Sequence, residues 1–274
     1  MSVVIVIISI VATFGLEGAA QFMDRTAYRT TIERIDAIDR AIADFRRVNG
    51  YLPCPALQSL TPTTACYGKQ VTALGPPVAC ASTGSTCVAT AMITSNPTSL
   101  VYGDVPVRDL GLPLNYMVDG YGSKFRYVAT KDMTTSASYV TTADGIAMRS
   151  GRLDDTCSGS SKRCQSLGTA AYIVTSGGRD RRGTMVAASA SLYSACVANA
   201  DNDGKIDAAN CRMSATNWPS TAVALAYGST VTPAAAGTSV SVPNNVFYDS
   251  RFNAGKIEDN YFDDIVRWRS KSVL

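Results

Sequence analysis

The sequence predicts an α+β protein in which a long N-terminal helix is followed by a β-rich head. Two patterns predict this class. Residues 1–50 contain no proline and pass from an apolar run into an amphipathic segment. After residue 50, short β-branched and aromatic runs alternate with Gly- and Pro-containing turns. We therefore expect a helix over residues 1–50, packed on an antiparallel sheet in a head over residues 51–274.

The first half of the expected helix is apolar. Ser2–Val11 is an unbroken apolar run that continues to about Leu16, which is short for a spanning helix of about 20 residues. Gly18-Ala19-Ala20 could serve as a signal-peptide cleavage site, but no Lys or Arg precedes the run. Nothing breaks the helix before Ile32, so we expect a retained anchor that continues into the second half.

The second half carries one apolar stripe and should pack on the head. The stripe repeats at intervals of three, three, four and three residues, and its members are Ile32, Ile35, Ile38, Ile42 and Phe45. Charged residues occupy the other faces. Asn49-Gly50 supplies the left-handed stop, and Pro53 prevents continuation of the helix.

Composition argues against catalysis and nucleic-acid binding. The chain has no His, the commonest general base and metal ligand, so any catalysis would need Cys, carboxylate or Ser–Lys chemistry. We expect a structural protein and not an enzyme, which fits the missing His. A net charge of +3, from 25 basic and 22 acidic residues, gives no electrostatic footprint for nucleic acid.

Eight cysteines without a C-x-x-C pair indicate disulfides and an exported protein, although several could be buried thiols. They are Cys54, Cys66, Cys80, Cys87, Cys157, Cys164, Cys196 and Cys211. Short loops favour the pairs Cys80–Cys87, Cys157–Cys164 and Cys196–Cys211, which leaves Cys54 with Cys66.

One segment fits the register of a calcium loop. Its candidate ligands are Asn199, Asp201, Asp203, the carbonyl of Lys205, Asp207 and Asn210, with Gly204 at the turn. Two asparagines replace the usual acids, so we expect weak Ca²⁺ binding, in the range of about 10⁻⁴–10⁻³ M. The alternative is a surface turn without an ion.

In the head, strand-like composition falls on Lys124–Ala129, Ser138–Thr142, Ala171–Thr175, Thr184–Ala188, Val240–Val242 and Phe262–Trp268. Residues 56–100 are rich in Pro, Thr, Ser and Ala, so we expect a long loop there.

Several segments together resemble the segments of one known family. Met1–Ala12 (MSVVIVIISIVA) resembles the N-terminal helix, and Asn49–Ala56 (NGYLPCPA) the exit into the head, of type IV pilins and the pseudopilins of type II secretion. The order of the remaining segments resembles a group of prepilin-like proteins: Gly103–Pro113 (GDVPVRDLGLP), Asp119–Tyr127 (DGYGSKFRY), Ala171–Gly183 (AYIVTSGGRDRRG) and Phe262–Leu274 (FDDIVRWRSKSVL). The family's cleavage motif is absent, so we expect the true start upstream of Met1.

The resemblance implies a pilin fold and a structural subunit of a pilus or pseudopilus. Such a subunit rests in the inner membrane through its N-terminal helix. It then packs against copies of itself or other pilins, with the help of the assembly machinery, in a filament at the cell surface or in the periplasm. The alternative is a secreted, calcium-stabilised adhesion module whose first 20 residues are removed.

Overall fold

The computed structural model describes residues 2–58, 60–70, 92–94, 99–151, 164–179, 181, 184–188, 230–231, 240–241, 246–248 and 265–274. Its helices are α1 (Ser2–Asn49), α2 (Ser136–Tyr139) and the 3₁₀ turns η1 (Leu114–Met117), η2 (Lys131–Thr134) and η3 (Lys271–Val273). Its strands are β1 (Met92–Thr94), β2 (Ser99–Asp104), β3 (Arg126–Thr130), β4 (Ile146–Gly151), β5 (Cys164–Ala170), β6 (Tyr172–Ser176), β7 (Thr230–Val231), β8 (Val240–Ser241), β9 (Val246–Tyr248) and β10 (Ile265–Arg269).

The main sheet has five strands in the order β1-β2-β3-β6-β10, and every neighbouring pair is antiparallel. The second half of α1 lies along one side of this sheet, next to β10 and β6. The α+β class predicted from the sequence is therefore confirmed, with one long N-terminal helix packed on an antiparallel sheet.

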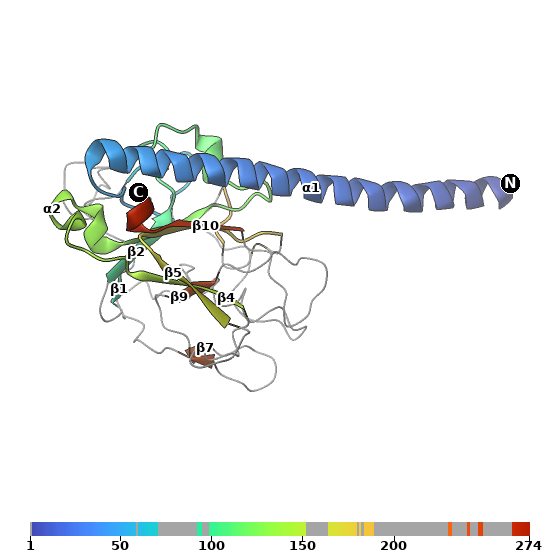
Figure 1. Cartoon of the computed structure of the whole chain (residues 1–274). Coiled ribbons are helices and arrows are strands. Elements are labelled where there is room, and N and C mark those ends of the chain that lie inside the picture. Colours follow the sequence, from blue (N-terminus) through green and yellow to red (C-terminus); the bar gives the residue numbers. More distant parts are fainter. Residues whose placement is uncertain are drawn as a thin grey trace.

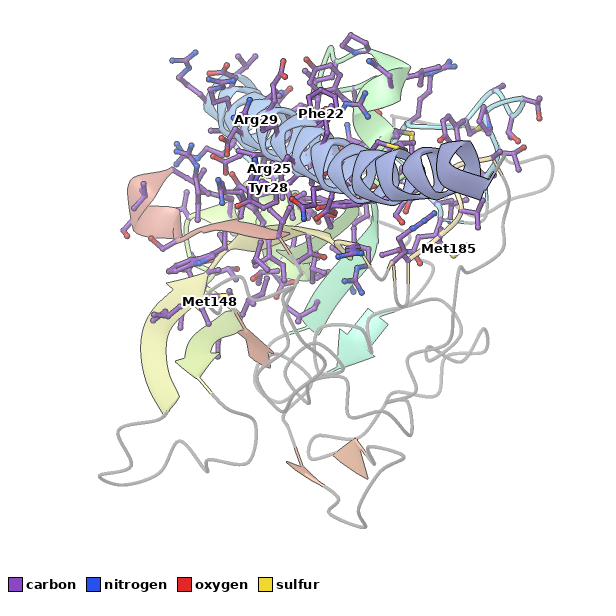
Figure 2. The ribbon with its side chains drawn as sticks, turned by 90° about the vertical axis from the view of Figure 1, so that its right-hand side faces the viewer. Phe22, Arg25, Tyr28, Arg29, Met148 and Met185 are labelled. Carbon is purple, nitrogen blue, oxygen red and sulfur yellow. The ribbon has the colours of Figure 1, made fainter. Side chains whose placement is uncertain are left out.

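A second sheet lies on the side of the main sheet opposite α1 (Figures 1 and 2). Its strand order is β5-β4-β9, and β4 and β9 run parallel, which departs from the purely antiparallel head that we expected. Met148 of β4 is fully buried. The short strands β7 and β8 pair with each other.

The first half of α1, by which we mean residues 2–23, extends beyond the head as a rod (Figure 1). In the portion of the chain that the structure describes, no helix has a segment both long enough and apolar enough to cross a membrane. The helix ends where expected: Gly50 has a left-handed φ of +80°, and its N–H donates to the Arg46 carbonyl at 2.7 Å.

The core forms where the stripe of α1 meets the main sheet. Ile35, Ile38 and Ile42 are fully buried, and Ile32 packs against the same cluster. Phe45 is only half-buried and stacks edge-on against Tyr51, with ring centroids 5.8 Å apart. The stripe is thus fully buried at its three middle residues and partly exposed at both ends.

Three local expectations in the head were wrong. Ser138–Thr142 was expected as a strand, but its first residues belong to α2. There, the hydroxyls of Ser138 and Thr142 bond nearby carbonyls, and such local bonds favour turns over strands. In Thr184–Ala188, no strand forms: Met185 and Val186 are isolated bridge residues, and Val186 pairs with Ser123. Residues 56–100 include β1 and the start of β2, because β2 pairs with the buried strand β3.

We expect Ile38→Ala to lower the free energy of unfolding by about 2–5 kcal/mol, because it opens a cavity in the core that α1 shares with the sheet. Val48 provides the control, since it lies on the same helix and is 80% exposed. Val48→Ala should change the free energy of unfolding by about 0.5 kcal/mol or less. Urea titration followed by circular dichroism measures both. Equal losses in the two variants would contradict the packing described here.

Candidate functional site

The calcium-type loop at residues 199–210 lies outside the described residues, as do most of the cysteines. Cys54 and Cys66 are described, and both are disulfide-bonded. Within the described ranges, no group of three or more acidic or cysteine side chains is placed to hold a metal ion. The features that the structure brings together lie instead where α1 joins the head.

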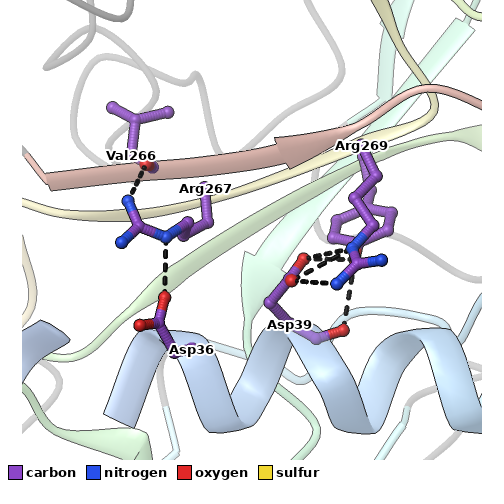
Figure 3. Close-up of polar contacts among 6 residues, drawn as sticks. Asp36, Asp39, Val266, Arg267 and Arg269 are labelled. Carbon is purple, nitrogen blue, oxygen red and sulfur yellow. Dashed lines mark hydrogen bonds and ion pairs between the residues drawn. The ribbon is translucent and has the colours of Figure 1, made fainter. Parts of the chain in front are cut away.

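Two acids of α1 bind two arginines of β10 (Figure 3). Asp39 accepts both Nε and Nη2 of Arg269, at 3.0 Å and 2.5 Å, and Tyr172 donates to the same carboxylate at 2.7 Å. Asp36 accepts Nε of Arg267 at 2.7 Å. The hydrogen bond to Asp39 raises the pKa of Arg269, so this guanidinium stays charged. These contacts fix the helix against the edge strand. We call such a cluster of polar contacts, which attaches α1 or the segment after it to the head, a joint, and this is the first of three.

The Asp119–Ser123 turn forms a second joint with α1. The buried Asp119 carboxylate accepts the N–H groups of Tyr121 and Ser123 and the hydroxyl of Ser176. Burial raises the pKa of Asp119, and these hydrogen bonds lower it in part. One carboxylate thus connects two of the sequence segments on which the resemblance rests, DGYGSKFRY and AYIVTSGGRDRRG.

Gly120 brings this turn into contact with the backbone of α1. A Cβ atom at Gly120 would lie 2.0 Å from the Ala27 carbonyl oxygen, so a larger residue does not fit. The Gly120 N–H donates to the hydroxyl of Thr31 at 2.9 Å, and Nη1 of Arg34 donates to the Val118 carbonyl at 2.6 Å. The turn is therefore bonded directly to the helix.

A third joint connects the chain exit after α1 to the sheet through a buried lysine. Lys124 is fully buried, and its Nζ donates to the carbonyls of Gln58 and Leu60 at 2.9 and 2.8 Å. Nζ also lies 3.3 Å from Oδ2 of Asp104, which is equally buried. The ammonium of DGYGSKFRY thereby holds the segment that follows NGYLPCPA.

A groove opens where α1 leaves the head, and we call it the neck groove. It has a volume of about 460 Å³, and its walls are Phe22, Met23, Thr26, Ala27, Thr30 and Arg34 of α1, with Asp119, Gly120 and Gly122 of the turn. Phe22 and Met23 are 71% and 70% exposed. Figure 2 shows Phe22 with Arg25, Tyr28 and Arg29 on this part of the helix. Large apolar side chains exposed beside a groove are typical of interaction surfaces.

Comparisons with models of protein families, with curated proteins and with solved structures gave no match for this chain. The joints and the groove therefore have to be interpreted from their own geometry.

The sequence analysis singled out the apolar stripe but missed the polar joints. One signal was available: Asp36 and Asp39 lie three residues apart on one helix face, and Arg267 and Arg269 alternate on one strand face. Nothing local in the sequence identifies Asp119 or Lys124 as buried, because their partners lie in distant segments.

We expect Asp39→Asn to lower the free energy of unfolding by about 1–3 kcal/mol, because it removes the negative charge from the bidentate, partly buried ion pair with Arg269. Asp36→Asn is the matched control. The Asp36–Arg267 pair is 42% and 38% exposed, so its loss should cost less than about 1 kcal/mol. Denaturant titration of both variants tests the difference, and a larger loss for Asp36→Asn would contradict it.

The stability of the head should depend on the ionisation of Asp104. Burial raises the pKa of Asp104 to about 7, although Lys124 acts in the opposite direction. An acid whose pKa is raised by folding stabilises the folded state most below its unfolded pKa of about 3.9, and this contribution is lost as the pH rises to about 7. The melting temperature of the parent minus that of Asp104→Asn should therefore fall between pH 4 and 7 and then level off.

Asp132→Asn, which changes an exposed carboxylate, is the control for this pH series. Its difference from the parent should change much less over the same range. The difference in melting temperature between the parent and Asp104→Asn could instead stay constant or increase with pH. Either result would show that folding does not raise the pKa of Asp104.

Proposed function

We propose that this chain is a structural subunit of a type IV pilus or a pilus-like filament, such as a pseudopilus. The observation that carries the proposal is that the two halves of α1 lie in different surroundings. Its second half belongs to the core of the head, whereas its first half extends beyond the head. Between Ser2 and Met23 the sequence contains one charged residue, Glu17.

The sequence of this half is mostly apolar, and an apolar segment that extends beyond the described part of the head needs an environment that removes it from water. Before assembly, the inner membrane provides that environment. In the filament, the first halves of neighbouring α1 helices provide it for one another, and the heads face outward. This role requires no catalytic group from the chain. The order of the pilin-like segments supports the same function.

The joints described above suit a subunit that has to carry load. The isoleucine stripe and the Asp39–Arg269 pair attach the helix to the main sheet, and the Gly120 turn attaches it to a second part of the head. A pull on the first half of α1 is therefore distributed over the main sheet and the turn instead of one strand.

The test is to image sheared surface material from cells that express the chain, by negative stain with antibodies against the head. We expect labelled filaments from the parent. A variant that lacks residues 1–20 should keep its head, with a melting temperature within a few degrees of the parent, because the buried contacts of α1 begin after residue 26. It should form no filaments.

Mass spectrometry of the mature protein provides the companion measurement. An intact or extended N-terminus in filaments would support the proposal. A soluble protein in the medium that starts near Gln21 and forms no filament would overturn it. That result would support the secreted calcium-stabilised module instead.

A further inference from the structure

The neck groove carries one cation with unused hydrogen-bonding capacity. Nη1 of Arg34 donates to the carbonyls of Val118 and Asp119, at 2.6 and 3.3 Å. In the part of the chain that the structure describes, Arg34 forms no ion pair, and its Nε and Nη2 have no partner. A guanidinium held in place by Nη1 can still present its other edge to a carboxylate.

The walls of the groove admit a helix. Ala27 and Gly122 are small, and the exposed Phe22 and Met23 give the groove an apolar entrance. Small residues let two helices approach closely, and apolar flanks gain from being covered. The occupant that fits is therefore a largely apolar helix with one acidic residue.

The first half of α1 has this composition. Between Ser2 and Met23, Glu17 is the single charged residue and is flanked by apolar and small residues on both sides. The partner cannot be the same molecule. Glu17 and Arg34 belong to one continuous helix, so they are separated by about 26 Å at about 1.5 Å per residue. A second copy of this chain supplies the segment without this restriction.

We infer that the neck groove receives the first half of α1 from a second copy of this chain, with Glu17 of that copy paired to Arg34. The inference rests on the proposed function and specifies the contact between neighbouring subunits. It implies that parallel neighbours are displaced along the helix axis by about 26 Å.

Photo-cross-linking of the full chain in expressing cells tests the location. The probe is p-benzoylphenylalanine at Thr30, which lines the groove, and the control carries it at Arg47, whose side chain is 75% exposed on the same helix. We expect the Thr30 probe to give a dimer in which the second copy is labelled between about residues 10 and 24, and the Arg47 probe not to label that segment. Labelling of a head segment, of lipid or of an unrelated protein from Thr30 would overturn the inference.

A charge exchange tests the pair itself. Arg34→Glu and Glu17→Arg should each reduce the Thr30 dimer about tenfold, and the double variant should restore most of it. Arg34 also holds the 118–119 backbone, so a purely structural role predicts that Glu17→Arg cannot rescue Arg34→Glu. Unchanged dimer yield in both single variants, or no rescue, would overturn the pairing.

The two proposals fail in different ways. If the parent forms filaments but the Thr30 probe does not label residues 10–24 of a second copy, the groove inference is overturned and the filament proposal stands. If the expected cross-link forms without any filament, the filament proposal is overturned and the pairing of two copies stands.

Discussion

The structure depends on the burial of one face of α1. Ile35, Ile38 and Ile42 are completely removed from water against the main sheet, which makes the second half of the helix part of the core of the head. Burial of such side chains contributes about 1.5–3 kcal/mol each. Because α1 is one continuous helix, this local packing also determines the direction in which its first half leaves the head.

Apolar contact alone does not fix the orientation of α1 on the head, because the hydrophobic effect is not directional. The polar joints fix that orientation. Asp39 fixes the helix to β10, Asp119 closes the turn that touches Ala27, and Lys124 holds the segment after the helix. Each is a charged group with several partners, so replacing the charged group itself would leave all of these partners without their hydrogen bond. Segments that are far apart in the sequence are thus connected by the pairs Asp104–Lys124, Asp119–Ser176 and Asp39–Arg269.

The sequence was sufficient for elements whose signals are local. Periodicity predicted α1 and its buried stripe, Asn49-Gly50 predicted its end, and strand-like composition predicted β3, β6 and β10 approximately. The sequence was insufficient for elements whose formation depends on contacts that a local pattern does not show. β2 lies in a Thr- and Pro-rich stretch and becomes a strand because β3 pairs with it, and α2 forms through hydroxyl bonds that strand propensity ignores. The groove combines α1 with a turn about 90 residues away, so no local pattern could have predicted it.

The inferred contact has a consequence for assembly. The neck groove and the first half of α1 are different surfaces, so a contact between them is heterologous and each copy still has one free donor and one free acceptor. Such a contact produces a ring only if the rotation closes without translation. A displacement of about 26 Å along the axis at every step prevents closure and gives a helical filament. The joints that hold α1 at a fixed angle to the head, above all Asp39 with Arg269, then keep this step the same from one subunit to the next.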